Sequence, residues 1–276
     1  MNEREGRGVA DLSQLDTSER FTEYFVAGVA AKFPAGEVPM QPIDEPVKGG
    51  YKGSEKWILF SPIEYARRGF IDANLIKRLK NGAHMLSVGV GPAYLERAIQ
   101  RVFDIPSEQI TLADKAWYKQ ALQTPFPKAK FDMTKPWPKH LSKFDIMLFP
   151  ESFGAVETRR PERSALGTGH IVRRKSDPFP QSYIDASVYH ILRWDDESPP
   201  LSRIDEYSEM VERDIPEAKT RLSILQSAIG HLNQPGQIRI SGHLMNEQIM
   251  AYVYGRLKRE YPEVNFTAGG KPIRDF

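Results

Sequence analysis

The 276 residues of the chain include no cysteine. Disulfide bonds, catalytic thiolates and cysteine-ligated zinc or iron–sulfur clusters are therefore excluded. The chain also lacks a Gly-Lys-Ser or Gly-Lys-Thr step, which the phosphate-binding loop of nucleoside triphosphatases requires. The spacings of its histidines and aspartates match no compact ligand motif, so we predict no metal site.

The chain also has little net charge and no long apolar run. Lys and Arg number 38 against 36 Asp and Glu, and a formal net charge of +2 demands no polyanionic partner. No stretch approaches the roughly 20 apolar residues that span a bilayer. The polar segment Met1 to Asp16 lacks the apolar core of a signal peptide. We therefore expect a cytoplasmic protein with no membrane part, and the oligomeric state stays open.

Residues 1–80 predict a polar tail followed by a helical extension. Apolar residues at helical spacing predict a helix over Ser18–Lys32 and a second one from Pro62, with a break near Gly69. Prolines and glycines between positions 39 and 50 predict an irregular connection. This extension precedes the main domain, which we expect over residues 81–276.

The main domain alternates short apolar strands with helices. This order is typical of an α/β domain with a doubly wound, mostly parallel sheet and helices on both faces. The expected strands are His84–Val88, Ile110–Ala113, Lys130–Met133, Phe144–Phe149, Gln237–Ser241 and Val264–Thr267. The expected helices are Tyr94–Phe103, Trp117–Leu122, Tyr183–Trp194, one or two within Ile204–Leu232, and Asn246–Tyr261. A basic insertion, at about 155–202, follows the fourth strand.

A glycine-rich turn joins the first of these strands to its helix, with the sequence Ser87-Val88-Gly89-Val90-Gly91-Pro92-Ala93. Gly89 and Gly91 let the backbone approach a ligand closely, because no side chain intervenes. The helix that follows directs its amide groups and the positive end of its dipole at the same place. Alone, the motif fits a ligand site and a tight turn without a ligand about equally.

Acidic residues follow three of the expected strands. Asp114 ends the second strand about 25 residues after Gly89, near the spacing of a ribose-binding acid. Asp132 ends the third strand, where a carboxylate can bind the exocyclic amine of adenine. Glu151 follows the fourth strand at the same edge of the sheet.

These features resemble the class I S-adenosylmethionine-dependent methyltransferases over about His84 to Gly154, and less closely over Gly236 to Tyr261. The resemblance implies that the glycine turn passes the methionine portion of S-adenosylmethionine. It also implies that Asp114 holds the ribose and Asp132 the adenine amine. The cofactor contacts implied in this way are Ser87, Gly89, Val90, Gly91, Pro92, Asp114, Lys115, Asp132, Met133 and Glu151.

The chain departs from the family pattern at two positions of the turn. Ser87 stands where family members usually have an acidic residue, and Ala93 stands where they often have a third glycine. Ser87 can form a hydrogen bond, but it offers no charge to the methionine ammonium. A nicotinamide- or flavin-binding Rossmann domain is the nearest competitor, and it needs Gly or Ala where Tyr94 stands.

Glu151 and His243 are the candidate catalytic residues, because each follows a strand and each can take a proton from an acceptor. The alternatives are a helix-terminal charge for Glu151 and a polar loop or core residue for His243. Near-zero net charge favours a small-molecule acceptor. A non-catalytic module that keeps the fold to bind a ligand or partner is the main alternative. RNA methylation is a further one, suggested by the basic insertion.

Overall fold

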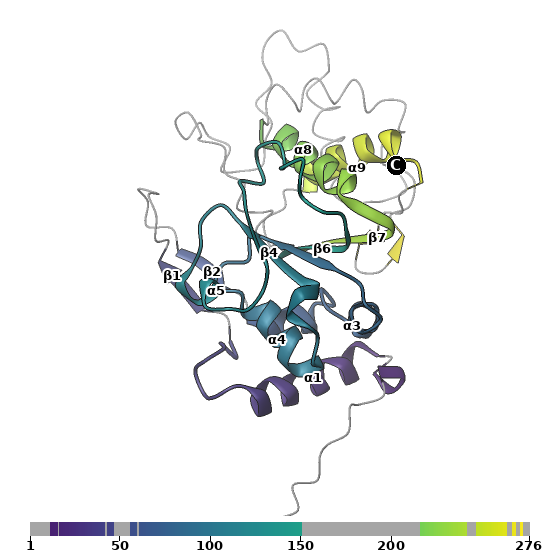
Figure 1. Cartoon of the computed structure of the whole chain (residues 1–276). Helices are drawn as coiled ribbons and strands as arrows, with labels where there is room; N and C mark the ends of the chain where they lie inside the picture. Colours follow the sequence, from purple (N-terminus) through teal and green to yellow (C-terminus); the bar gives the residue numbers. More distant parts are fainter. Residues whose placement is uncertain are drawn as a thin grey trace, which may run out of the picture. The chain divides into compact units, whose positions relative to one another are not determined.

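The computed structural model of the chain divides into two compact bodies (Figure 1). The first body comprises Met1–Asp132, Pro138–Pro150 and His231–Ser241, and the second comprises Met133–Trp137, Glu151–Gly230 and Gly242–Phe276. The structure describes residues 12–15, 17–41, 43–46, 56–59, 61–150, 216–241, 247–263, 267–268 and 271–272. Glu151, His243, the insertion at 155–202 and the expected helix Tyr183–Trp194 lie outside these ranges.

A five-stranded, fully parallel sheet forms the centre of the first body. Its strands are β3 (Met85–Val88), β4 (Ile110–Asp114), β5 (Lys128–Lys130), β6 (Phe144–Pro150) and β7 (Leu232–Ser241). They lie in the order β5-β4-β3-β6-β7. From β3 the chain builds outward through β4 to β5, then returns to place β6 on the other side of β3. This reversal confirms the doubly wound, Rossmann-like α/β fold, with its switch point between β3 and β6.

The third strand begins and ends earlier than expected. We predicted it over Lys130–Met133, whereas β5 spans Lys128–Lys130. The apolar residues Phe131 and Met133 suggested the later position, but the pairing with β4 already begins where Leu112 N donates to Pro127 O. The last ladder bond, from Phe131 N to Asp114 O, leaves Asp132 as the first residue beyond the pairing.

The face of the sheet that carries Met85 and Leu112 packs against the N-terminal helices (Figure 1). These helices are α1 (Ser18–Lys32), α2 (Pro62–Arg67), α3 (Ala73–Lys80) and α4 (Tyr94–Phe103), with the short η1 (Leu12–Gln14), η2 (Ser107–Gln109) and α5 (Lys119–Leu122) beside them in sequence. Leu86 and Val88 on the opposite face are also buried, so both faces of the sheet are covered. The predicted extension therefore contributes to the core of the sheet.

Helix α1 packs on α4 through aromatic rings. The ring of Phe103 stacks with those of Phe21, Tyr24 and Phe25, and each pair of centroids is 5.8 Å apart. The N-cap Thr17 accepts a hydrogen bond from Arg20 N, and α1 ends before Pro34 as predicted. The break expected near Gly69 is also present, because this residue adopts a left-handed φ of 68° between α2 and α3.

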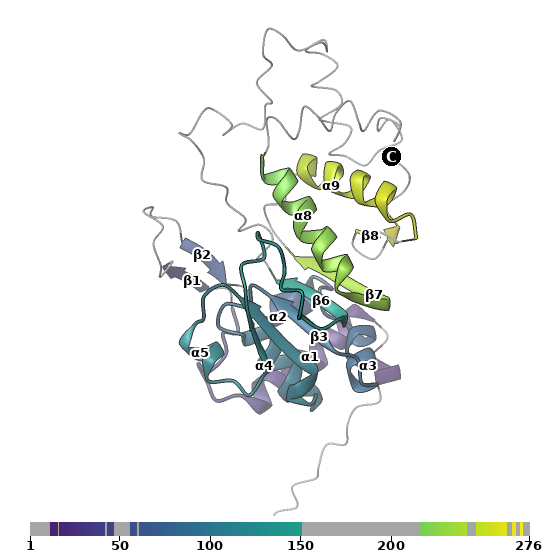
Figure 2. The same ribbon diagram turned by 45° about the horizontal axis from the view of Figure 1, so that its top comes forward.

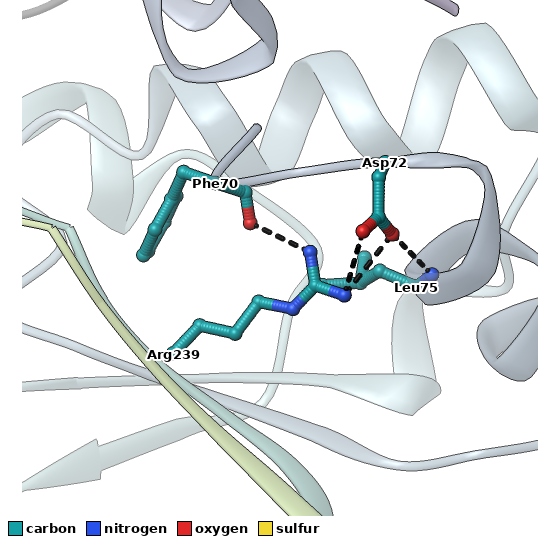
Figure 3. A network of polar contacts seen from close by, with 4 residues as sticks. All are labelled: Phe70, Asp72, Leu75 and Arg239. Carbon is teal, nitrogen blue, oxygen red and sulfur yellow. Dashed lines mark hydrogen bonds and ion pairs between the residues drawn. The ribbon is translucent and has the colours of Figure 1, made fainter. Parts of the chain in front are cut away.

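The start of α3 is tied to β7 by a compact polar network (Figure 3). Asp72, the N-cap of α3, accepts a hydrogen bond of 2.8 Å from Leu75 N. Both of its carboxylate oxygens also lie 3.0 Å from Nη2 of Arg239, whose Nη1 donates to Phe70 O. The Arg239 side chain is only 11% exposed, so this charge-assisted contact fixes the place of α3 beside the sheet.

The connection between α1 and α2 contains an element that the sequence did not predict. Strands β1 (Ile43–Pro46) and β2 (Lys56–Leu59) pair antiparallel, with Ile43 opposite Leu59. Pro46 is tolerated because it ends its strand in a two-stranded pair.

The second body contains the helices α8 (Pro216–Gly230) and α9 (Glu247–Glu260), which lie side by side (Figure 2). The Gln226 side chain donates to a carboxylate oxygen of Glu260 at the end of α9. Two short strands, β8 (Thr267–Ala268) and β9 (Lys271–Pro272), pair antiparallel. Within the segment expected to form one or two helices over Ile204–Leu232, residues 216–230 form α8, and residues 204–215 lie outside the described ranges.

Candidate functional site

The glycine turn follows β3 and is fixed to the end of β4. Gly89 has a φ of 73° and Gly91 a φ of 53°, both in the left-handed region that side chains disfavour. Gly89 N donates a 2.7 Å hydrogen bond to Ala113 O, which anchors the turn at the carboxyl end of the neighbouring strand. The two glycines are therefore required by the backbone path, with or without a ligand.

Helix α4 begins directly after this turn without a side-chain cap. Its N-cap position is Ala93, which has a left-handed φ of 60° and provides no capping hydrogen bond. The first amide groups of a helix have no partner within the helix, and they carry the positive end of its dipole. The start of α4 thus presents uncapped positive potential next to the turn.

Asp114 joins the turns that follow β3 and β4. Its Oδ2 accepts a long hydrogen bond of 3.4 Å from Gly91 N, and its Oδ1 accepts one of 3.2 Å from Ala116 N. Partial burial raises the pKa of Asp114, although the hydrogen bonds from Ala116 and Gly91 and the charge of Lys115 oppose this. Each carboxylate oxygen can accept a second hydrogen bond, which leaves capacity for a hydroxylated ligand.

Ser87 lies beneath the turn and is fully buried. Its Oγ donates a 2.5 Å hydrogen bond to Oε1 of Glu96, a residue in the first turn of α4. Glu96 is itself only 1% exposed, and no group in the described part of the chain forms a hydrogen bond with its Oε2. The buried carboxyl group of Glu96 thus contacts the end of β3, at a position where β3 itself provides only the hydroxyl of Ser87.

Burial raises the pKa of Glu96 from 4.5 to about 7. The hydrogen bonds from Ser87 and from the backbone of Glu96 favour the ionised form, whereas the charge of Asp114 adds to the increase. Taking a carboxylate out of water without a cation is costly, so the group shifts toward its neutral form. A titratable group poised near neutral pH is characteristic of a functional site.

The structure brings most of the predicted cofactor contacts to the carboxyl ends of the neighbouring strands β3 and β4. Asp132 comes just after β5, although it does not end that strand. Met133 belongs to the second body. Glu151 follows β6 directly in sequence, but it is outside the described ranges, like His243. The contacts gathered at these strand ends are Ser87, Gly89, Val90, Gly91, Pro92, Asp114 and Lys115.

The sequence interpretation missed Glu96. Its signal was present, because Glu96, Ile99 and Phe103 follow the spacing of one helical stripe and all three are buried. A carboxyl group on the apolar stripe of a helix, one turn after a glycine loop, is unusual enough to mark a site.

A cleft of the first body lies away from the glycine turn. About 400 Å³ in volume, it is lined by residues of α4 and of the segment around α5, among them Arg97, Gln100 and Gln123. Its two arginines, Arg97 and Arg101, both form ion pairs with Glu37. Because Glu37 already engages both arginines and the glycines of the turn do not line it, we assign this cleft no role.

Within the described ranges, no cluster of three or more histidine, aspartate or glutamate side chains is arranged to hold a metal ion. No helix of this described part has the length and apolar character needed to cross a bilayer. The comparisons with known proteins returned no matching family model and no matching curated protein.

Proposed function

We propose that the chain binds S-adenosylmethionine at the carboxyl ends of β3, β4 and β5 and transfers its methyl group to a small-molecule acceptor. The contact of Asp114 with Gly91 N carries this proposal. It joins a carboxylate at the end of β4 to the glycine turn after β3, the strand that borders the switch point of the doubly wound sheet, where such folds bind their ligands. The resemblance of the sequence to class I methyltransferases is the reason for proposing S-adenosylmethionine as the ligand.

The donor and acceptor groups fit this cofactor. In the proposed complex Asp114 accepts from the ribose hydroxyls, and Asp132, just past β5, accepts from the adenine amine. The amides at the start of α4 and the turn between Gly89 and Ala93 face the methionine portion. A bound S-adenosylmethionine supplies a methyl group on a sulfonium that is already activated, so orientation of the acceptor provides much of the rate.

The proposed base for the methyl acceptor and the proposed class of acceptor both come from the sequence. Glu151 and His243 follow β6 and β7 in the chain, and each is a base that can take the proton released when a hydroxyl or ammonium acceptor is methylated. The formal net charge of +2 favours a small molecule over a polyanion. Glu151→Gln and His243→Gln are expected to slow turnover, and His243→Gln should leave cofactor affinity unchanged.

Isothermal titration calorimetry with S-adenosylmethionine and S-adenosylhomocysteine tests the cofactor assignment. We expect Asp114→Asn to weaken both ligands by roughly 10- to 100-fold, because hydrogen bonds to a charged acceptor are worth about 1.5–3 kcal/mol. Asp104→Asn is the matched control, since Asp104 is exposed at the far end of α4. Absence of binding by the wild-type chain at millimolar ligand would refute the proposal.

The acceptor class needs a separate measurement. Transfer of radiolabelled methyl groups to fractionated small molecules and to total RNA distinguishes the favoured acceptor from the polynucleotide alternative. Tight cofactor binding with no transfer to any fraction would instead identify a ligand-binding module that retains the fold.

A further inference from the structure

The hydrogen-bonded pair of Ser87 and Glu96 is buried next to the glycine turn. Ser87 is the second-last residue of β3 and precedes Gly89 by two positions. Glu96 is the third residue of α4. Their hydrogen bond therefore connects the strand before the glycine turn to the helix after it. Class I methyltransferases usually have an acidic residue where this chain has Ser87.

We propose that Glu96 supplies, from helix α4, the negative charge that strand β3 lacks, and that this charge selects the cationic methionine portion of the ligand. This inference rests on the proposed function, because it concerns the same site. Glu96 is buried and acts through its charge and through Ser87, so it is a positioning residue and forms no part of the catalytic machinery.

The absence of a neighbouring cation supports this role. Among the described residues, no lysine or arginine forms an ion pair with Glu96, and its Oε2 has no hydrogen-bond partner. Within the described ranges, the groups that act on its pKa are the Ser87 hydroxyl from β3, its own backbone amide in α4, and Asp114 from β4, whose negative charge opposes ionisation. A purely structural buried carboxylate is normally paired, because an unpaired one costs stability.

The same surroundings make the group responsive to a ligand. A cation brought to the turn favours the ionised form of a nearby carboxyl group. Since the pKa of Glu96 is about 7 in the free protein, a substantial fraction of the molecules is protonated at neutral pH. Binding of an ammonium- and sulfonium-bearing ligand should therefore expel a proton, whereas binding of an uncharged one should not.

The decisive comparison uses two ligands that differ in the methionine portion. S-adenosylmethionine carries it, and 5′-methylthioadenosine has the adenosine and sulfur without it. We expect Glu96→Gln to weaken S-adenosylmethionine by roughly tenfold or more and to change methylthioadenosine less than about twofold. Glu108→Gln is the matched control, because Glu108 is exposed in η2 and the change in charge is the same. Ser87→Asp added to Glu96→Gln should restore most of the lost affinity.

A second readout does not depend on the variant's affinity. Calorimetry of the wild-type chain at pH 7, in buffers of different ionisation enthalpy, should detect proton release when S-adenosylmethionine binds. Glu96→Gln should reduce this release, which removal of a merely structural hydrogen bond would not do. Glu96→Asp provides a conservative check if the glutamine variant unfolds.

The outcomes separate this inference from the proposed function. If the wild-type chain binds neither ligand, the cofactor assignment fails and this inference fails with it. If it binds both, but Glu96→Gln retains full affinity for S-adenosylmethionine and full proton release, only the role of Glu96 is overturned. Equal weakening of both ligands by Glu96→Gln would also overturn it, because a charge-selective group must distinguish them.

Discussion

Helices α3 and α4 begin at the same level of the sheet, yet their starts are built in opposite ways. Ser87, Leu148 and Arg239 are register partners across β3, β6 and β7, so the contacts of Ser87 and Arg239 arise from one row. On the α3 side, Asp72 caps the helix and both of its oxygens contact Arg239. On the α4 side, the helix has no side-chain cap, and Glu96 has no cation and one unpartnered oxygen among the described residues.

The difference separates a helix start whose polar groups are paired within the fold from one whose polar groups stay available to the proposed ligand. A capped and ion-paired carboxylate such as Asp72 stabilises the native state. A buried carboxyl group without a cation reduces stability, and natural proteins retain such groups mainly at functional sites. We call the capped start of α3 at Asp72 the closed start, and the uncapped start of α4 at Ala93 the open start.

The largest expected effect is a change in the pH dependence of stability at the open start. Between pH 4.5 and about 7 the folded state keeps a proton on Glu96 that the unfolded chain has released, so stability falls as the pH rises through this range. A shift from 4.5 to about 7 corresponds to a loss of about 3 kcal/mol. Urea unfolding at pH 4, 6 and 8 should show a shallower fall for Glu96→Gln, which becomes the more stable protein above pH 7. Identical pH profiles for the two proteins would contradict the buried, unpaired state of Glu96.

The next effect concerns the closed start. Asp72→Ala removes the cap of α3, worth about 1 kcal/mol, and leaves the largely buried Arg239 without its carboxylate, so we expect a total loss of about 2 kcal/mol. Asp72→Asn keeps a capping oxygen and should lose roughly half as much. Chemical denaturation at pH 7 measures both variants. A loss no larger for Ala than for Asn would indicate that the cap contributes nothing.

A smaller effect tests how α4 is held. Polar contacts fix the start of α3, whereas α4 is positioned by apolar packing against α1, and a methyl group added at Gly28 would lie 2.5 Å from Cγ1 of Val102. Valine is stiff at χ1, so Gly28→Ala should cost about 1–2 kcal/mol, measured by thermal unfolding. Gly230→Ala in α8 is the control, because no atom lies within 4 Å of the added methyl group. Equal stability of the two variants would show that the α1–α4 contact is loose.

The smallest effect concerns the backbone of the open start. Ala93 adopts a φ of 60°, which glycine tolerates better than alanine, but its methyl group is fully buried, so the two effects oppose each other and Ala93→Gly should change stability by less than about 1 kcal/mol. Ala98→Gly in the same helix should lower stability by about 1 kcal/mol or more, because Ala98 is helical and buried. Calorimetric melting temperatures measure both. A loss at position 93 as large as the loss at position 98 would show that the left-handed conformation carries no strain.

Local signals predicted much of the fold. Helices α1 and α4 have the predicted bounds, because each combines a strong apolar period with a clear boundary, such as Pro34 or the glycine turn. Strand β5 was misplaced, since a three-residue edge strand carries almost no periodic signal and its ends are set by pairing with β4. Strands β1 and β2 were missed for a similar reason: each is only four residues long, the sequence between them is rich in glycine, and only their mutual pairing defines them.

The position of Asp114 at the end of β4 was predicted correctly, whereas its role in binding stays a prediction. Asp114 meets the glycine turn as its position after an apolar strand suggested. Glu96 was missed because Ser87 was interpreted from its own strand alone, as a position without charge. The carboxyl group reaches Ser87 from the next helix, a tertiary relation that strand-by-strand comparison with a family pattern does not include.

The pairing of β6 with β7 also governs the order in which the molecule can assemble. Strand β6 ends at Pro150 and β7 begins at Leu232, so residues 151–231 must be synthesised before the fifth strand can add to the sheet. The stack of α1 on Phe103 needs only the first hundred or so residues. Non-local pairing of this kind is slow, because a long loop must close before any contact compensates for the lost chain entropy. On the ribosome, the side of the sheet that holds the glycine turn can form first, while β6 remains an open edge until Arg239 arrives to meet Asp72.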